Sequence, residues 1–253
     1  MTARLAFLLA LLAVFGFATA GRAAPPAECL VAEPQLEHLF DLPAAARALA
    51  AKKLDVLVVG AGSSMLPGAN GAKFAYPARL QNALTEMLPN VAVKISTDVS
   101  SHRNAAEMVK SLPAALAASK PDLVIWQTGT VDAVQSVDPD AFSQSLDQGI
   151  NLVRNAGADV VLVNAQYSPR TESMIALDTY TENMRWVALQ HEVPLFNRLG
   201  IMRVWSDLGT FDFTTPTKKL DIAERVHDCI GRLLAELIVE ATKPGGPHTA
   251  ADR

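Results

Sequence analysis

Short runs of apolar, mostly β-branched residues alternate with helical patterns along most of this chain. Gly, Pro, Asp or Asn bounds each run, as expected for strands that are buried on both faces of a sheet. The runs are Val56–Val59, Val91–Ile95, Leu123–Trp126, Val160–Val163 and Pro194–Phe196. The helical stretches are 44–51, 77–87, 105–118, 142–156, 179–191 and 223–241. This alternation predicts a single α/β domain, a doubly wound three-layer fold in which right-handed crossovers join a five-stranded parallel sheet.

The composition fits such a domain and excludes several other classes of protein. The chain has 253 residues, of which 50% are hydrophobic and 19% charged, so it can bury a sizeable core and is too apolar for intrinsic disorder. Its net charge of −4 supplies no field that would attract a phosphate backbone, and we therefore expect no nucleic-acid partner. Its 14 Gly and 2 Cys exclude collagen-like and disulfide-dense scaffolds.

The first residues have the pattern of a secretory signal peptide. Arg4 precedes an apolar run, Leu5–Phe17, that is too short to span a bilayer, and small residues provide a cleavage site at Ala18–Ala20 or at Ala23. We expect residues 1–23 to be removed and the protein to be periplasmic or secreted without a transmembrane anchor; an uncleaved N-terminal anchor is the alternative. The rest divides into an arm and helix (24–52), the domain (53–242) and a flexible tail (243–253).

Export determines how the two cysteines are interpreted. An even pair in an oxidising compartment favours a disulfide, so we predict a bond between Cys29 and Cys229. In the chain-entropy model, closing a loop of this length contributes at most roughly 5 kcal/mol. Two cysteines alone cannot form a structural zinc site, and we expect no metal and no cofactor.

Ligands of doubly wound folds bind beyond the carboxyl ends of the strands, so the residues after each strand carry the functional information. The first strand is followed by Gly60–Met65, with the sequence Gly-Ala-Gly-Ser-Ser-Met. A dinucleotide-binding fingerprint needs glycine in place of Met65, and a nucleophile elbow needs a glycine two residues after Ser64. The Gly-Lys pair of a phosphate-binding loop is also missing from this turn, so none of these three motifs applies.

Other features of these turns resemble the SGNH/GDSL hydrolases. Gly62-Ser63-Ser64 follows the first strand and Gly129-Thr130 follows the third. Longer stretches are similar to exported proteobacterial members of that family, and the similarity spans most of the chain from Lys53 to Ala235; these stretches are 76–80, 120–130, 157–167 and 193–205. The resemblance implies a flavodoxin-like topology and a serine esterase or carbohydrate deacetylase.

The resemblance assigns Ser64 as the nucleophile and places an oxyanion hole beside it. In the family the hole uses the amide of the nucleophile, a glycine after strand two and an asparagine after strand three. In this sequence Ser100 (or Ser101) occupies the glycine position, while Gly129 and Thr130 are kept and Val131 replaces the asparagine. Valine has no side-chain donor, so two of the three donors are missing from their expected positions.

The family's Asp-x-x-His segment is also altered. Aligned through Cys229, it falls on residues 218–221, so that Lys218 takes the place of the orienting acid and Asp221 that of the base. Lys218, Lys219 and Asp221 are instead candidate substrate-binding residues, and the two lysines would favour an anionic ligand.

A shifted alignment restores an acid-x-x-His pair. It uses His227 as the base and Glu224 as its orienting carboxylate, but the amphipathic pattern of Ile222–Leu237 places His227 inside a helix. His102, or a Ser-Lys arrangement with Lys218, are the other candidate bases.

Three functions follow from these assignments. The first is hydrolysis of acyl or acetyl esters, of small molecules or glycans, through Ser64, which the altered residues predict to be weak or lost. The second is a degenerate, non-catalytic periplasmic protein that binds a glycan, a lipid or a partner in the same crevice, with a small ester or glycan as the expected ligand. The third is a mainly structural envelope protein. The sequence does not indicate whether the protein is a monomer or an oligomer.

Overall fold

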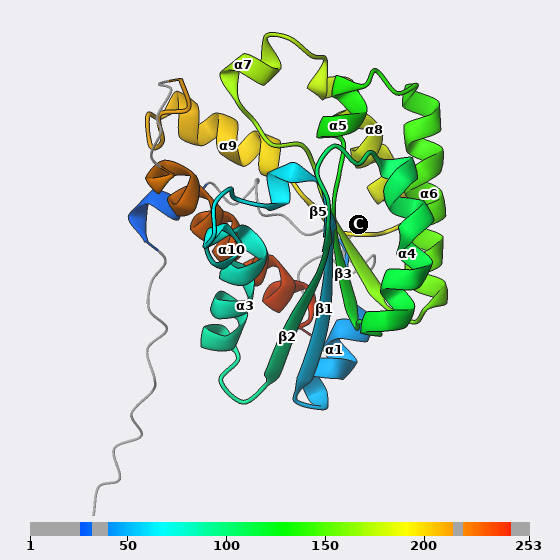
Figure 1. Cartoon of the computed structure of the whole chain (residues 1–253). Coiled ribbons are helices and arrows are strands. Elements are labelled where there is room, and N and C mark those ends of the chain that lie inside the picture. Colours follow the sequence, from blue (N-terminus) through cyan, green and yellow to red (C-terminus); the bar gives the residue numbers. More distant parts are fainter. Residues whose placement is uncertain (1–25, 32–39, 215–219, 244–253) are drawn as a thin grey trace, which may run out of the picture.

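The computed structural model describes residues 26–31, 40–214 and 220–243. Five parallel strands form one sheet in the order β2-β1-β3-β4-β5 (Figure 1). The strands are β1 (Lys53–Gly60), β2 (Ala92–Val99), β3 (Leu123–Gln127), β4 (Asp159–Val163) and β5 (Leu195–Phe196). This order confirms the predicted doubly wound sheet. β2 lies on one side of β1, and β3, β4 and β5 follow one another on the other side.

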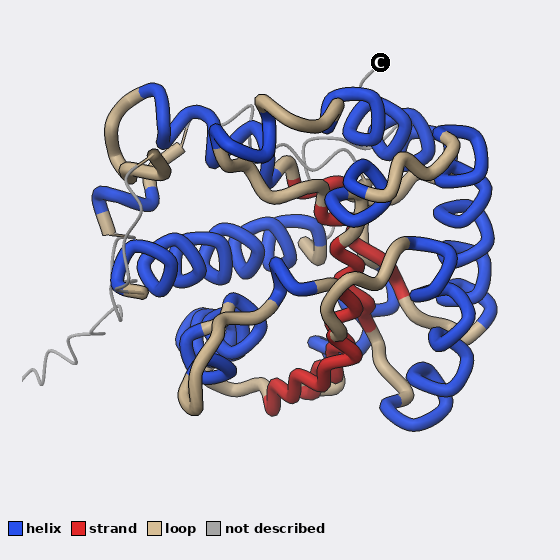
Figure 2. The backbone as a smooth tube through the Cα atoms, turned by 45° about the horizontal axis from the view of Figure 1, so that its top comes forward, coloured by secondary structure: helices blue, strands red, loops and turns tan. Residues whose placement is uncertain are grey.

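Helices cover both faces of the sheet and give the three layers that the sequence predicts. α3 and α10 pack together on one face, and α4, α6 and α8 form the other layer (Figure 1); Figure 2 shows the same layering in a tilted view. The longer helices are α1 (Pro43–Ala50), α3 (Tyr76–Met87), α4 (Ala105–Ser119), α6 (Pro139–Asn155), α8 (Leu177–Gln190), α9 (Arg198–Asp207) and α10 (Asp221–Ala241). The short ones are η1 (Ala27–Cys29), η3 (Gly62–Ser64), α2 (Gly71–Phe74), α5 (Thr130–Val134) and α7 (Pro169–Glu172).

Local chemistry explains where the elements differ from the expected ranges. α6 begins at Pro139, three residues before the expected start at Phe142, because the Asp138 side chain accepts hydrogen bonds from the amides of Asp140 and Ala141. β2 continues past the apolar run to Val99, since it is an edge strand whose residues are only partly buried.

The predicted disulfide between Cys29 and Cys229 is present, with a Cα–Cα distance of 4.9 Å. It fixes the segment around η1 to the middle of α10, and Glu28 forms an ion pair with Arg225 on the same helix. Within the described residues, none of the helices combines the length and apolar character needed to cross a bilayer. The predicted signal peptide and nearly all of the predicted tail lie outside the described residues.

The carboxyl ends of the central strands meet at one edge of the sheet. β1 and β3 are parallel neighbours, with Val59 opposite Trp126, and β3 pairs with β4 so that Gln127 lies opposite Val163. The turns that leave these strands therefore lie together with the beginning of α9 at the edge where ligands of such folds bind (Figure 1).

Candidate functional site

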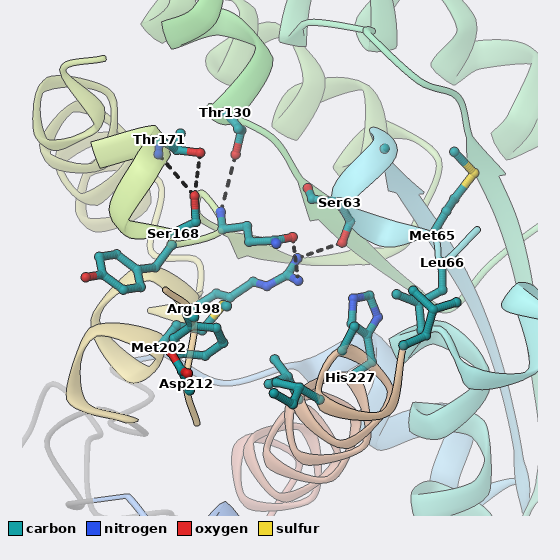
Figure 3. A pocket seen from close by; sticks show the side chains of 18 residues that line it. Ser63, Met65, Leu66, Thr130, Ser168, Thr171, Arg198, Met202, Asp212 and His227 are labelled. Carbon is teal, nitrogen blue, oxygen red and sulfur yellow. Dashed lines mark hydrogen bonds between the residues drawn. The ribbon is translucent and has the colours of Figure 1, made fainter. Parts of the chain in front are cut away.

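A cavity of about 550 Å³ lies beyond the carboxyl ends of the strands (Figure 3). We call it the main cavity. Its lining comes from the turn after β1, the segments after β3 and β4, α9 and its following loop, and the start of α10. The polar lining residues are Ser63, Thr130, Gln166, Ser168, Thr171, Arg198, Asp212 and His227. The apolar wall includes Met65, Leu66, Tyr167, Met202, Phe213, Leu220, Ile222 and Val226. This volume and mixed lining are typical of small-molecule sites.

Ser64 lies in η3, directly after β1, but its side chain does not line the main cavity. The residue is 2% exposed, and its Oγ lies 2.5 Å from Oε1 of Gln127 and 3.2 Å from the hydroxyl of Tyr76. Ser64 instead borders a smaller groove of about 410 Å³ beside β2 and α3. The neighbouring Ser63 lines the main cavity, and its Oγ donates to the same Gln127 oxygen at 2.9 Å.

His227 reaches the main cavity from within α10, as the amphipathic pattern indicated. Its Nδ1 accepts a 2.9 Å hydrogen bond from the backbone amide of Tyr76. In a neutral imidazole the other nitrogen then carries the proton, so Nε2–H is a donor. Burial, assisted by the positive charge of Arg198, lowers the pKa of His227 to about 3. A neutral ring in this tautomer has no free lone pair with which to accept a serine proton.

The predicted pairing of His227 with Glu224 needs a different tautomer, because an orienting carboxylate accepts from Nδ1–H. Here the amide of Tyr76 occupies Nδ1 as a donor. Glu224 lies half-buried in the first turns of α10, and it is not part of the cavity lining. Asp221, the first residue of the helix, is exposed and also outside the lining.

The remaining candidate bases do not line the cavity in the described part of the chain. His102 is exposed in the turn after β2, where its backbone carbonyl accepts from Gln135. Lys218 and Lys219 lie outside the described residues.

Of the predicted oxyanion residues, only Thr130 reaches the main cavity, where its Oγ1 accepts from the amide of Gln166 at 3.3 Å. Ser100 is exposed after β2, and its amide donates to Gly60 O at 3.2 Å. Val131 packs against the core.

Gly129 and Asp132 form a hydrogen-bonded turn at the start of α5. With φ at +99°, Gly129 adopts a conformation that favours glycine, and its amide donates to Oδ2 of Asp132 at 3.2 Å. The other oxygen of Asp132 accepts from the amide of Ala105 at 2.9 Å. Burial raises the pKa of Asp132. Because the Gly129 amide is engaged, it offers no donor to a ligand in the described structure.

Arg198 is a candidate functional residue that the sequence pattern did not indicate. It is fully buried at the start of α9; Nη1 donates to Ser63 O at 2.9 Å and Nη2 to Gln166 Oε1 at 3.1 Å. Its Cζ lies 5.7 Å from the centre of the Tyr76 ring, while Nε has no partner. Burial lowers the pKa of Arg198 to about 10, so the group remains charged at neutral pH. Its position two residues after β5, at the ligand-binding edge, is the signal that could have identified it.

No group of three or more His, Cys, Asp or Glu side chains suited to a metal ion occurs among the described residues. The donors that face the main cavity are instead a guanidinium, an imidazole N–H and several hydroxyls. Such a set can bind anionic or hydrogen-bond-accepting groups.

Solved hydrolase structures share this fold. TesA is 22% identical with a TM-score of 0.56, and the match covers 72% of this chain and 99% of that one. A lipase/acylhydrolase from Enterococcus faecalis is 15% identical with a TM-score of 0.58, covering 73% and 95%. Axe2, an acetylxylan esterase from Geobacillus stearothermophilus, is 16% identical with a TM-score of 0.57, covering 74% and 94%.

A search of curated proteins finds no match. The model of the Non-GDSL lipase-like family matches residues 28–244, which include the whole sheet and every lining residue of the main cavity. This chain therefore belongs to the Non-GDSL lipase-like family and has the fold of the SGNH/GDSL hydrolases.

Proposed function

We propose that this protein is an exported member of its hydrolase family in which ester hydrolysis through Ser64 is weak or lost, and that the crevice binds a small molecule, such as an ester or glycan. The observation that carries the proposal is the environment of Ser64: its hydroxyl pairs with the amide oxygen of Gln127 and with Tyr76, and it contacts no imidazole of the residues that the structure describes.

A serine hydroxyl is a weak nucleophile unless a base removes its proton. The amide oxygen of Gln127 accepts a hydrogen bond but does not take up a proton at neutral pH. Burial raises the pKa of Tyr76, so this side chain is a neutral phenol rather than a phenolate. His227 bonds to a backbone amide through Nδ1 and keeps its only proton on Nε2. Ser64 thus has no base in contact among the described residues.

The transition state would also lack stabilisation. Val131 has no side-chain donor at the asparagine position, and the amides of Ser100 and Gly129 bond to Gly60 and Asp132. Removing a single oxyanion donor typically lowers kcat by about 10²–10³. Missing donors and a missing base together support weak or absent turnover.

Export is supported by the signal-peptide pattern of residues 1–23 and by the disulfide, since structural disulfides form and persist in oxidising compartments. The alternative to a vestigial enzyme is a non-catalytic periplasmic binding or envelope-associated protein. The main cavity favours binding over a purely structural role, because its polar donors and apolar wall enclose a volume suited to a small molecule.

Ester turnover by the purified protein tests the proposal. We expect chromogenic acetate and butyrate esters and acetylated xylo-oligosaccharides to be hydrolysed at the background rate. Ser64→Ala should leave that rate unchanged, whereas loss of a working nucleophile would lower kcat by about 10⁴–10⁶.

Ser63→Ala is the matched control, because it removes the neighbouring hydroxyl that faces the main cavity. His227→Ala, His102→Ala and Lys218→Ala test the candidate bases. Equal rates in all variants that remain folded would support the proposal. Robust turnover that disappears in Ser64→Ala and in one of the base variants would refute it.

A further inference from the structure

The guanidinium of Arg198 is a buried charge without an acidic partner. It is 0% exposed, and no carboxylate of the described residues lies within 4.0 Å of it, although the structure contains ion pairs for six other arginines. Its two hydrogen-bond partners, Ser63 O and Gln166 Oε1, are both neutral. Removing an ion from water costs several kcal/mol unless an opposite charge offsets the loss.

Arg198 has unused donor capacity. A guanidinium carries five N–H groups, and only two of its nitrogens make hydrogen bonds here. Nε is buried and has no partner at all. Nε of Arg79 and of Arg103 also lacks a hydrogen-bond partner, so the donors that a ligand could reach are those of the two Nη groups, which carry four N–H bonds and make two hydrogen bonds.

Further donors surround Arg198 in the main cavity. The ring of His227 rises from α10 toward Ser63 (Figure 3), and the hydroxyls of Ser168 and Thr171 line the same cavity. Because Nδ1 of His227 is an acceptor, Nε2–H remains as a donor.

One carboxylate, Asp212, borders the same cavity but does not neutralise Arg198. Its Oδ1 accepts from the amide and hydroxyl of Thr214, so it is engaged by its own loop. Figure 3 places it beside Met202, away from the guanidinium. No carboxylate of the described residues therefore neutralises the charge of Arg198 in the main cavity.

Another part of the cavity lining is apolar. Met65 and Leu66 contribute from the turn after β1, and Ile222 and Val226 contribute from the first turns of α10. A ligand that satisfies both parts of the lining must combine an anionic group with an apolar portion.

We propose that the main cavity binds a small organic acid, through a carboxylate or phosphate monoester group held by Arg198 and His227. The apolar portion of the ligand lies against the wall formed by Leu66, Ile222 and Val226. On binding, an anionic oxygen replaces Oε1 of Gln166 at Nη2 of Arg198; Gln166 is only half-buried and can turn aside. This inference rests on the proposed binding function and specifies the chemistry of its ligand.

Calorimetric titration of the purified protein tests the charge requirement. Hexanoate and hexyl phosphate are the probes, and hexanamide, with the same apolar chain and no charge, is the control. We expect saturable binding of at least one of the two acids, about tenfold or more tighter than hexanamide, which corresponds to about 1.4 kcal/mol. The tighter of the two acids identifies the head group. Equal affinity for hexanoate, hexyl phosphate and hexanamide, or no binding of either acid, would overturn the proposal.

Substitution of Arg198 tests the site. Arg198→Met removes the charge at similar volume, a replacement that buried ionic groups often tolerate; we expect acid binding to weaken by about tenfold or more. Arg185→Met removes an exposed arginine of α8 and should bind as the wild type does. Arg198→Lys keeps the charge but loses the planar fork, so it should also bind more weakly and serves as the deciding variant if Arg198→Met does not fold. Wild-type affinity in a folded Arg198 variant would overturn the proposal.

This experiment is independent of the test of hydrolysis. If Ser64-dependent turnover were found while acids bound through Arg198, the proposed loss of activity would fail and the acid site would stand. If neither turnover nor acid binding were found, the acid site alone would fail.

Discussion

His227 and Arg198 share one cavity, and the charge of Arg198 adds to burial in keeping His227 neutral. Burial lowers the pKa of His227 to about 3, and the guanidinium of Arg198 contributes to this shift because it disfavours a second positive charge nearby. The backbone amide of Tyr76 fixes the same neutral form, because it donates to Nδ1. At the scale of single residues, His227 is thus a neutral hydrogen-bond donor rather than a base.

Stability should depend on pH through His227. The unfolded imidazole has its ordinary pKa of 6.5 and the folded one a pKa of about 3, so between these values only the unfolded chain binds the proton. The contribution of this group is complete above pH 6.5 and is lost as pH falls toward 3, with a slope approaching about 1.4 kcal/mol per pH unit. Urea unfolding of the wild type and of His227→Gln between about pH 7 and about pH 4 measures the effect.

The variant separates His227 from the carboxyl groups that titrate in the same range. Gln can accept from the Tyr76 amide and does not titrate, so its stability should fall less steeply on acidification than that of the wild type. Parallel curves for the two proteins would show that His227 titrates normally and would contradict the assigned tautomer.

At the scale of elements, α10 determines where His227 lies. Its apolar residues form one stripe that packs against α3, and this packing fixes the rotation of the helix. Gly231 lies at the closest approach: an added Cβ would stand 2.7 Å from Cβ of Arg79 and 2.7 Å from the amide nitrogen of Leu80. The two helices can approach this closely only because position 231 has no side chain.

Gly231→Ala should therefore destabilise the protein, although alanine favours helices by about 1 kcal/mol over glycine. Backbone atoms of α3 cannot move aside easily, and overpacking of this kind costs about 1–3 kcal/mol. The cost minus the gain leaves an expected net loss of up to about 2 kcal/mol in the free energy of unfolding, measured by urea denaturation. Glu240→Ala, a surface change on the same helix, should stay within about 0.5 kcal/mol of the wild type. An increase in stability for Gly231→Ala would contradict this packing.

The sequence predicted those elements that are long enough for their apolar residues to recur at a regular spacing. All five strands and the six longer helical stretches are present, because burial on one or two faces leaves a regular apolar pattern. The sequence did not indicate α9 or the short helices α2, α5 and α7. A turn or two of helix shows little period, and α9 begins directly after a strand of only two residues.

At the scale of the whole molecule, topology predicts the edge of the site but not its contacts. The alternation of strands and helices places the crevice at the carboxyl ends of the strands, and export chemistry predicts the Cys29–Cys229 bond. Which side chains face the cavity depends on the rotation of one short turn, which directs Ser63 into the main cavity and Ser64 toward Gln127. Arg198 meets Ser63 from a distant part of the chain, and no local pattern records that contact.

The central claim is that Ser64 is not an activated nucleophile, and reaction with a fluorophosphonate tests it most directly. Such reagents form a covalent adduct on a serine hydroxyl that a neighbouring base activates, and they need no knowledge of the natural substrate. The purified protein is incubated with the reagent beside an active serine esterase as a positive control, and both are measured by intact-mass spectrometry. We predict no change in the mass of this protein. A stoichiometric adduct that maps to Ser64 would contradict the account.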